Sequence, residues 1–427
     1  MASTNSFASN FTRKIMRSFL DKFESERVLT KNVDTQLFSG KFNPSTGADI
    51  DVKRPTDYVS VRTANGDLTA ESESDIITGK ATATVQDYFT TFVDYDEADE
   101  AIEMDQLDQL LAPMATRMKT DFELDFANFM KDNSGLLSGT YGSPALTWDD
   151  IAAYGSIMDA TGVPMDQQWN VAVNPFTQRK LASDQRSLGA GGSAGGLISE
   201  AHRRAILSDN FAGMKVMSAN TLGSNTIAAG ADRVGAITSV DVTYLTAKDT
   251  MQQSIVVSGF EANLVIAKGE VLRVTGRNRL NLSTRQEILD ETGAAILFSG
   301  TVVSDVTLSG TGTGTIVITG PAIFEAAGQY NTSSSAIAAA DVITLLGTAG
   351  DVIQPNLFWH KQAFTVASVP IKKLSATDTI ATTEDGLQFR VTHDSDFIKN
   401  KNLVRIDFRP AYGVMNPFFA GQGFGTP

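Results

Sequence analysis

Histidine and carboxylate side chains are the groups in this chain that could do acid–base or metal chemistry. The 427-residue sequence has three histidines, His202, His360 and His393, and their separation matches no metal-ligand spacing. The metalloprotease motif HExxH is absent. Carboxylate pairs are plentiful, so spacing alone leaves a glycosidase-type pair open. We predict no catalytic residue, no metal site, no cofactor and no enzyme activity.

Three further tracts resemble binding motifs without matching them. The acidic run Asp94–Asp108 lacks the glycine and the closing glutamate of a calcium loop, so it is better interpreted as a solvated helix start. The glycine tract at 189–196 has no following Gly-Lys-Ser/Thr and no strand leading directly into it, which favours a surface loop. The repeat GTGTGT at 310–315 is most simply a hairpin turn.

Composition narrows the class of protein. Hydrophobic residues make up 42% of the chain and charged residues 20%, as in folded proteins. There is no cysteine, which excludes disulfides and thiolate chemistry. The net charge of −14 argues against tight, sequence-specific binding to nucleic acid. No apolar run reaches the roughly 18 residues of a membrane span, and the N-terminus lacks the apolar block of a secretory signal. We expect a soluble protein of cytoplasmic origin.

The elements that would organise this chain begin with a long amphipathic helix over Pro113–Lys131. Its apolar stripe recurs every fourth residue, and Pro113 suits a first helical position. The stripe consists of Met114, Met118, Phe122, Phe126 and Met130. A second amphipathic helix is predicted over residues 8–27, with Phe11, Ile15, Phe19 and Phe23 on one face. Amphipathicity leaves open whether this helix faces the core or docks on another chain.

Residues 39–95 have the period-two pattern of strands. One strand around Ile50 and Val52 ends at Arg54-Pro55, and Val85 with Tyr88–Val93 is interpreted as the returning arm. The polar stretch between them carries the turn signal Asn65-Gly66. An isolated two-stranded ribbon is marginally stable in water. We therefore expect a neighbouring molecule to complete this hairpin.

Residues 144–222 are predicted to be mixed α/β. A helix begins near Trp148, a strand covers Trp169–Val173, and a turn at Asn174-Pro175 leads into another helix. From about Gly223 to Gly350 the pattern indicates an all-β barrel or sandwich inserted into the α/β region. Its strand candidates are Val240–Tyr244, Ile255–Val257, Val271–Thr275, Ile296–Phe298, Val302–Leu308, Thr315–Thr319 and Val342–Leu346.

The end of the chain has clear strand alternation. Leu387, Phe389 and Val391 alternate with polar residues, as do Val404, Ile406 and Phe408. The linker between these two runs predicts an antiparallel pair with one solvated face. This pair is the expected bed for the long helix.

Four segments of this chain resemble the major capsid (coat) proteins of short-tailed, podovirus double-stranded DNA phages. The segments are IITGKATATV (Ile76–Val85), DQLDQLLAPMATRMKTDFELDFANFM (Asp105–Met130), NLFWHKQAFTVASVPI (Asn356–Ile371) and RPAYGVMNPFFAGQGFG (Arg409–Gly425). The resemblance covers the whole chain. It implies an α+β, Hong Kong 97-type capsid fold with an inserted all-β barrel, the I-domain.

The resemblance also implies a domain plan. An N-terminal arm spans 1–38, an E-loop with hinge strands 39–93, and a peripheral domain 94–139, with the spine helix at 97–132. The axial domain lies in 140–222 and 351–385, the I-domain in 223–350, and closing strands in 386–427. The function implied is a coat protein that self-assembles as pentamers and hexamers into an icosahedral shell around double-stranded DNA. A scaffolding protein and a portal at one vertex are the implied partners, with assembly in the host cytoplasm and no membrane.

Candidate site residues follow from the same resemblance. A loop of the I-domain would contact a neighbouring capsomer through Tyr244, Lys248, Asp249 and Gln252, with reciprocal ion pairs from Lys248 and Asp249. Acids of the arm would dock the scaffolding protein, and these are Asp21, Glu24 and Glu26. The E-loop would make contacts through Arg54, Arg62 and Lys80.

Two alternatives belong to other classes of protein. A receptor- or carbohydrate-binding phage surface protein would have a barrel that binds sugar alone, and a hydrolase would have a concave acidic pocket. Closed shells in electron micrographs would support the capsid interpretation alone.

Overall fold

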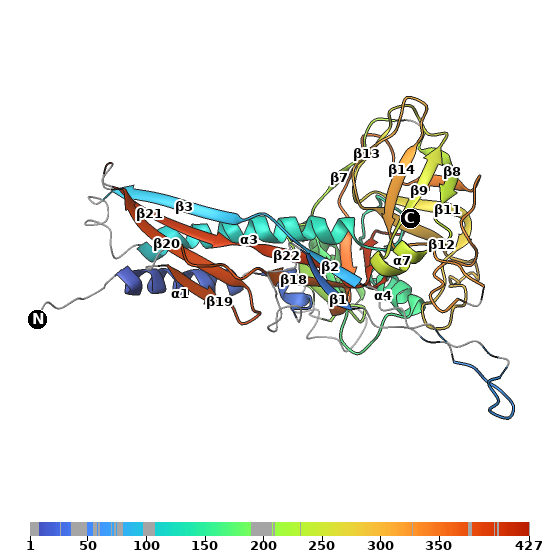
Figure 1. Cartoon of the computed structure of the whole chain (residues 1–427), viewed down its shortest axis with the longest axis horizontal. Coiled ribbons are helices and arrows are strands. Elements are labelled where there is room, and N and C mark those ends of the chain that lie inside the picture. The colour runs from blue at the N-terminus through green and yellow to red at the C-terminus, as the bar shows by residue number, and fades with distance from the viewer. Residues whose placement is uncertain are drawn as a thin grey trace, which may run out of the picture. The chain divides into compact units, whose positions relative to one another are not determined.

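Two units share the chain, and each is built from segments far apart in sequence. A computed structural model describes residues 8–25, 27–35, 49–53, 58, 60–69, 71, 74, 80–96, 107–188, 207, 210–230, 232–326, 328–374, 378–396, 398 and 401–426. The first unit comprises 1–50, 82–127 and 365–413, and the second comprises 51–81, 128–364 and 414–427. Figure 1 labels the helices and strands.

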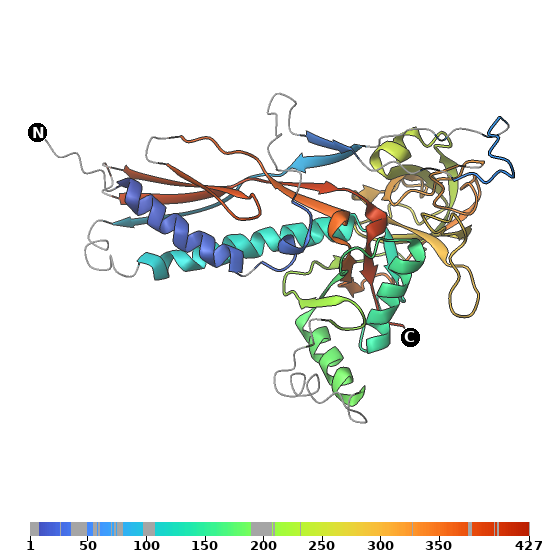
Figure 2. The same cartoon turned by 90° about the horizontal axis from the view of Figure 1, so that it is seen from below.

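A four-stranded antiparallel sheet forms the core of the first unit together with two helices. The strand order is β19 (Thr379–Thr382), β20 (Gln388–Asp396), β21 (Lys401–Phe408) and β3 (Phe89–Asp96). Helices α1 (Ala8–Ser25) and α3 (Leu107–Asp132) run side by side (Figure 2). The Phe122 ring lies 6.1 Å from Phe23 and 4.9 Å from Phe408. These contacts confirm that the closing strands form the bed of the long helix.

The start of α3 corrects one prediction. The helix begins at Leu107, so Pro113 lies inside it rather than at its first position. Proline in a helix interior removes one hydrogen bond and is disfavoured, which is why the sequence pattern suggested a boundary there. Pro113 is exposed, while Met114 and Ala115 beside it are buried. Packing of the apolar stripe therefore holds the helix through the proline.

The predicted hairpin is present, although its returning arm is shorter than expected. Strands β1 (Asp49–Lys53) and β2 (Lys80–Val85) are neighbours in a sheet of order β1-β2-β22-β18, where β22 is Pro410–Val414 and β18 is Phe364–Ser368. The stretch Tyr88–Val93 does not continue this arm, because β3 pairs with β21 in the other sheet. We call β1, β2 and the residues between them the ribbon.

A five-stranded mixed sheet begins the second unit. Its order is β4 (Leu136–Ser138), β23 (Ala420–Gly423), β17 (Asn356–Trp359), β5 (Asn170–Val173) and β6 (Lys215–Ser218). Helix α4 (Trp148–Thr161) starts with a capping box, in which Thr147 and Asp150 satisfy each other's backbone N–H groups. Helix α5 (Pro175–Leu188) follows the Asn174-Pro175 turn as predicted. The Tyr154 ring of α4 stacks on Phe358 of β17 at 5.2 Å.

A closed six-stranded barrel also lies in the second unit. Its order is β11 (Val271–Asn278), β12 (Leu297–Val302), β14 (Gly314–Thr319), β9 (Gln252–Ser258), β8 (Val234–Val240) and β15 (Val342–Leu345). Its buried core includes Ile255, Phe298, Ile316 and Ile343. Short strands pair beside it, β10 (Val265–Ile266) with β13 (Val306–Thr307) and β7 (Asn225–Thr226) with β16 (Val352–Ile353). The barrel expected from the composition shift is therefore present.

Two strand candidates need correction. Val240–Tyr244 is not a strand, because β8 ends at Val240 and Tyr244 precedes the short helix α7 (Leu245–Thr250). The stretch Val302–Leu308 is broken between β12 and β13 at residues 303–305. Apolar and β-branched composition suggested strands at both places, but turns interrupt them. The GTGTGT tract forms a turn and the first two residues of β14, and in the turn Gly312 N–H donates to the Ser309 carbonyl at 2.9 Å.

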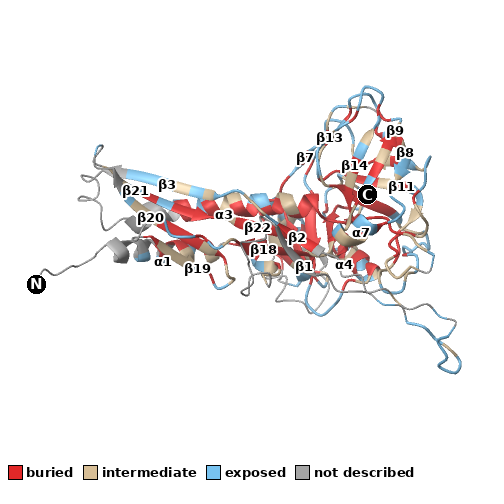
Figure 3. Cartoon of the chain, viewed as in Figure 1, coloured by how far each residue is buried: buried red, intermediate tan, exposed pale blue. Residues whose placement is uncertain are grey.

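Burial separates the faces of these elements clearly (Figure 3). Strand β3 is the outer strand of its sheet, and Phe92 on it is 72% exposed. The segment of α3 that carries the apolar stripe is buried along one side. No helix within the described ranges combines the length and apolar character needed to cross a membrane.

Candidate functional site

One of the described histidines, His360, has a structural role. His360 is buried, its Nδ1 accepts from the backbone N–H of Gln362 at 3.2 Å, and its Nε2 lies 2.9 Å from Asp166 Oδ1. Nε2 therefore carries the proton that it donates to the carboxylate. His393 is half-buried in β20, and His202 lies outside the described residues. Among the residues that the structure describes, no group of three or more potential ligands could hold a metal ion.

The spine-helix stripe is where the sequence placed it. Met114, Met118, Phe122, Phe126 and Met130 are all buried, and the least buried of them, Met114, is 8% exposed. On the opposite side of the helix Leu124 is 41% exposed. The stripe therefore belongs to the core and does not form a surface for another molecule.

Sequence reasoning missed a buried acid on the same helix. Glu123 is 1% exposed, and its carboxylate accepts hydrogen bonds from the backbone N–H groups of Leu29 at 2.7 Å and Thr30 at 3.1 Å. These donors open the 3₁₀ turn η1 (Thr30–Asn32), whose first N–H groups have no partner within the turn. Glu123 thus ties the segment after α1 to the spine helix. In the sequence, an acid beside an apolar stripe does not indicate that it will accept hydrogen bonds from a distant backbone segment.

A second charged contact holds the same segment. The buried guanidinium of Arg27 forms an ion pair with Asp385 and lies over the Phe23 ring at 5.4 Å. Phe19 and Phe23 of α1 are buried against β20, where Phe389 lies 5.4 Å and 4.8 Å from the two rings. In the structure of one chain, α1 therefore faces the core. The side chains of Phe11 and Ile15 lie outside the described residues.

The candidate scaffold-docking acids are placed differently from one another. Asp21 is exposed on α1. Glu24 is half-buried and accepts from the backbone N–H of Glu384 at 3.0 Å, so it also holds the loop before β20. Glu26 lies outside the described residues. Of the two described acids, Asp21 presents its charge most fully to solvent.

Between β1 and β2 the ribbon has an exposed tip, defined here as residues 60–69 with Glu71. Gly66 has φ +77°, which confirms the turn predicted at Asn65-Gly66. Asp67 Oδ1 accepts from the Thr69 backbone N–H at 3.0 Å, and Leu68 between them is 62% exposed. Hydrogen bonds from Thr69 lower the pKa of Asp67, which keeps it charged at neutral pH. Arg62 is exposed, whereas Arg54 and the Lys80 side chain lie outside the described residues.

The candidate inter-capsomer loop is a short helix with internal contacts. Tyr244 is 2% exposed and packs with Ala247 and Ile323, and burial raises its pKa. Lys248 Nζ lies 2.7 Å from Glu325 Oε1 within the barrel unit. Asp249 is half-buried on α7, and Gln252 begins β9 opposite Thr319. Tyr244 is therefore a core residue, because its side chain lies in a buried apolar cluster with Ala247 and Ile323.

A buried arginine also escaped the sequence reading. The Arg279 guanidinium donates to the carbonyls of Gly135 at 3.0 Å and Ser299 at 2.6 Å, and lies 5.5 Å from each of the Phe298 and Phe418 rings. Burial lowers its pKa to about 10, so it remains charged at neutral pH. This side chain joins the barrel to the residues that follow α3.

Charged residues at the end of α3 extend this joint. Asp132 lies 3.4 Å from Lys268 and 3.5 Å from Lys131, and desolvation by burial raises the pKa of Asp132 and lowers that of Lys131. Gln422 donates to the carbonyls of Lys131 and Gly269, each at 3.0 Å. We call Lys131, Asp132, Lys268, Gly269 and Arg279 the barrel base. Its backbone and side-chain bonds fasten the barrel to the sheet of the second unit.

Comparison with known proteins gives the family. The family model described as "P22 coat protein - gene protein 5" matches residues 1–425. A curated relative, the major capsid protein of Acyrthosiphon pisum secondary endosymbiont phage 1, is 32% identical over 429 residues, covering 99% of this chain and 100% of that protein. This match supports the capsid interpretation over the receptor-binding and hydrolase alternatives.

Solved phage structures are similar at low sequence identity. A chain from Mycobacterium phage Che8 is 12% identical with a TM-score of 0.46, covering 93% of this chain and 90% of that one. A chain from the capsid of cyanophage P-SCSP1u is 11% identical with a TM-score of 0.39, covering 89% and 84%. The family rests on the full-length matches in sequence: the chain belongs to the P22 coat protein family and is a major capsid protein, a structural component of a phage shell.

Proposed function

We propose that copies of this chain assemble as pentamers and hexamers into an icosahedral shell, with the Hong Kong 97-type domain plan. In that plan the arm is 1–38, the E-loop 39–93, the peripheral domain 94–139, the axial domain 140–222 with 351–385, and the closing strands 386–427. The barrel strands, which run from Val234 to Leu345, would be the core of an I-domain at 223–350. The role is structural rather than catalytic.

The observation that carries this proposal is the ribbon. Beyond the paired strands β1 and β2, its described residues Tyr58, Val61 and Leu68 are 60%, 39% and 62% exposed. Exposed apolar side chains of this kind gain stability when another surface covers them. Neighbouring copies in a shell would supply that surface, with Arg54, Arg62 and Lys80 as candidate contacts.

The acidic charge supports a container for DNA. A net charge of −14 disfavours tight binding to phosphates, so packaged double-stranded DNA would move freely along the inner wall during filling. Each copy touches several neighbours in a shell, and multivalency then multiplies modest pairwise contacts. A scaffolding protein, a portal at one vertex and assembly in the host cytoplasm complete the proposal.

Co-expression with the scaffolding protein of the same phage, followed by electron microscopy, tests this function. We expect closed shells of uniform diameter that contain this chain as the main component. Soluble monomers or small oligomers as the final product, in the presence of functional scaffold, would contradict the proposal.

The arm gives a sharper test of scaffold docking. Asp21→Lys reverses an exposed charge on α1 and should lower the amount of scaffolding protein incorporated per shell, because the charge attraction becomes repulsion. Asp159→Lys is the matched control, since Asp159 is exposed near the end of α4. Equal scaffold content in the two variants, measured by gel densitometry of purified shells, would reject the docking role of Asp21.

For the proposed inter-capsomer loop, apolar contacts replace the reciprocal ion pair of Lys248. A reciprocal ion pair through Lys248 would have to replace its bond to Glu325, whereas Val242 and Leu245 at the same corner are 65% and 72% exposed. We propose that this corner meets a neighbouring capsomer through these apolar side chains, with Asp249 and Gln252 beside them.

A further inference from the structure

A lysine, an asparagine and an aspartate meet at the barrel base. Lys131 Nζ donates a hydrogen bond to Asn225 Oδ1, and it lies 3.5 Å from Asp132 Oδ1. Lys131 and Asp132 are each 4% exposed, and Asn225 is 6% exposed. An amine that is hydrogen-bonded to a carbonyl oxygen already lies near the carbonyl carbon. Lys131 Nζ can therefore reach Asn225 Cγ with little movement, which is the geometry that favours reaction between two groups.

The backbone holds these three side chains in place. Lys131 and Asp132 are the last two residues of α3, and Asn225 begins β7, opposite Ile353 of β16. Gly269 closes the site: a Cβ added there would lie 2.6 Å from Asp132 Oδ1 and 2.7 Å from Asn225 Nδ2. The carboxylate oxygen and the amide nitrogen are therefore both packed against the same glycine.

Burial favours the uncharged forms of the lysine and the aspartate. Desolvation lowers the pKa of Lys131, and it raises the pKa of Asp132 despite the nearby charges of Lys131 and Lys268. Transfer of one proton from the ammonium to the carboxylate gives a neutral amine and a neutral acid. Asp132 Oδ1 accepts no hydrogen bond, so it is free to take this proton. A neutral amine is the form of lysine that acts as a nucleophile.

We propose that Lys131 and Asn225 join in an isopeptide bond within each copy of the chain, with Asp132 transferring the protons. Lys131 Nζ forms a bond to Asn225 Cγ, and the bond between Cγ and Nδ2 breaks. Asp132, as the neutral acid, gives its proton to Nδ2 and takes one from Nζ, so ammonia leaves and the acid is regenerated. The products balance the reactants, and the step needs no oxidant and no cofactor.

The bond closes a long covalent loop. Lys131 and Asn225 are 94 residues apart in sequence, and a cross-link over a long loop stabilises a protein largely by restricting its unfolded chain. This chain has no cysteine, so no disulfide can supply such a link. The bond would fasten the end of the spine helix to the strand that precedes the barrel. It forms within one copy, so its absence would leave the proposed assembly into shells intact.

The mass of the intact chain tests the bond. The purified full-length chain, denatured and measured by mass spectrometry, should be lighter than its sequence by one molecule of ammonia. Trypsin does not cleave after an acylated lysine, so digestion should give a branched peptide that joins Lys131 to Asn225. Cyclisation at Asn65-Gly66 would also release ammonia, but it would give no branched peptide.

Two variants separate the covalent bond from the hydrogen bond. Lys131→Arg retains a positive charge and a donor but has no amine, so it should keep the full mass of its sequence. Asp132→Asn leaves both joining residues in place and removes the group that transfers the protons. It should therefore also keep its full mass after the same time in solution.

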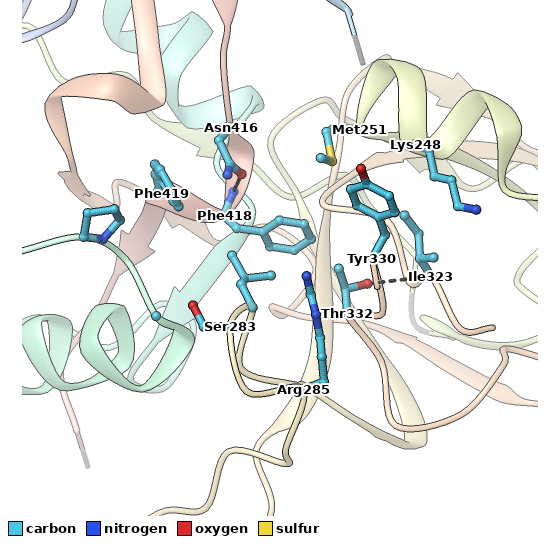
Figure 4. Close-up of a pocket in the computed structure, with 13 residues that line it drawn as sticks. Lys248, Met251, Ser283, Arg285, Ile323, Tyr330, Thr332, Asn416, Phe418 and Phe419 are labelled. Carbon is cyan, nitrogen blue, oxygen red and sulfur yellow. Dashed lines mark hydrogen bonds between the residues drawn. The ribbon is translucent and has the colours of Figure 1, made fainter. Parts of the chain in front are cut away.

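Lys248→Arg is the matched control. Lys248 is 10% exposed in its side chain and lies beside an acid, with Nζ 2.7 Å from Glu325 Oε1. It lines a cavity of about 290 Å³ together with Met251, Tyr330 and Phe418 (Figure 4). The Glu325 side chain is 35% exposed, so water reaches this pair and it stays ionic. Lys248→Arg should lose ammonia as the parent chain does.

Each result decides for or against the bond. Loss of ammonia in the parent chain and in Lys248→Arg, but not in Lys131→Arg or Asp132→Asn, together with the branched peptide, would establish it. A parent chain with the full mass of its sequence would overturn the inference, and so would a loss of ammonia that persists in Lys131→Arg. Unchanged bond formation in Asp132→Asn would contradict the role of Asp132.

Discussion

At the scale of single residues, Glu123 shows how one buried carboxylate can hold a whole segment. Its carboxylate accepts hydrogen bonds from the backbone N–H groups of Leu29 and Thr30. Without Glu123, these buried N–H groups would lose their acceptor. Each unsatisfied buried donor costs about 1–3 kcal/mol. The end of the N-terminal segment is therefore fastened by polar bonds as well as by the buried rings of Phe19 and Phe23.

We expect Glu123→Ala to loosen residues 28–32 without unfolding α3. Loss of the acceptor should speed amide exchange of Leu29 and Thr30 by roughly tenfold or more, corresponding to about 1.4 kcal/mol or more. Hydrogen–deuterium exchange with mass spectrometry measures this directly. Asp121→Ala is the control, because Asp121 forms an exposed i,i+4 pair with Arg117 that contributes little. Unchanged protection in Glu123→Ala would show that the carboxylate is dispensable.

A buried acid in the sheet of the first unit gives a pH dependence. Burial would by itself raise the pKa of Asp407, but hydrogen bonds from Arg390, Arg405 and Thr90 outweigh it and hold the pKa below 3.8. A lowered folded-state pKa contributes stability that is present above about 3.8 and is lost as the pH falls through the folded-state value. The sequence predicted this face of the sheet as solvated, yet the ion pairs bury Asp407 and Arg390.

We therefore expect Asp407→Asn to lower the melting temperature at pH 7 and to flatten its decline between pH 5 and pH 2.5. The neutral amide cannot gain the ionic bonds at high pH or lose them at low pH. Calorimetry of the unassembled chain measures both effects. Parallel pH profiles for the parent chain and the variant would rule out this role for Asp407.

At the scale of elements, the periodicity of apolar residues correctly predicted the helices and strands that bury one face in the core. It failed at element boundaries, which depend on local backbone geometry. The spacing of apolar residues predicted the stripe from Met114 to Met130 and the strand pair β20–β21. The structure confirms both, because the side chains of the stripe and of the apolar face of the pair are buried. Pro113 suggested a helix start because proline is disfavoured inside a helix. The packing that keeps α3 continuous on both sides of Pro113 is not apparent from the sequence. Tyr244 suggested a strand or loop, although its φ of +52° and its burial make it the N-cap residue directly before α7.

The barrel base was beyond prediction because its partners are far apart in sequence. Gly269, with φ +84°, lies so close to Asp132 and Asn225 that an added Cβ would meet their side-chain atoms at 2.6 Å and 2.7 Å. A glycine among the 35 of this chain gives no sign of such a contact. The candidate docking residues were likewise inferred by resemblance, since surface charges carry no periodic signal.

Gly269→Ala should destabilise the second unit by about 1–3 kcal/mol, because it forces both a strained φ and displacement of buried polar partners. Trp148, Trp169 and Trp359 all lie in this unit, so urea unfolding followed by tryptophan fluorescence monitors it selectively. Gly310→Ala is the control, as nothing lies within 4 Å of the added Cβ. Equal urea midpoints for the two variants would contradict the importance of the barrel base.

At the scale of the whole molecule, the chain is a shell protein whose ribbon tip is exposed in a single copy. Its packed parts, including the spine helix, the closing strands and the barrel, have their own cores and need no partner to explain them. The tip differs from them because Leu68 and Val61 are exposed on a turn that is held by local hydrogen bonds. Assembly is therefore expected to change the surroundings of the tip far more than those of the cores.

Amide exchange of residues 60–69, compared between the unassembled chain and purified shells, tests this claim most directly. We expect exchange at the tip to slow at least tenfold in shells, while the barrel strand β14, which is paired with β12 and β9 on its two sides, serves as the internal reference. Identical exchange at the tip in the two states would mean that no neighbouring copy covers it, and would contradict the account.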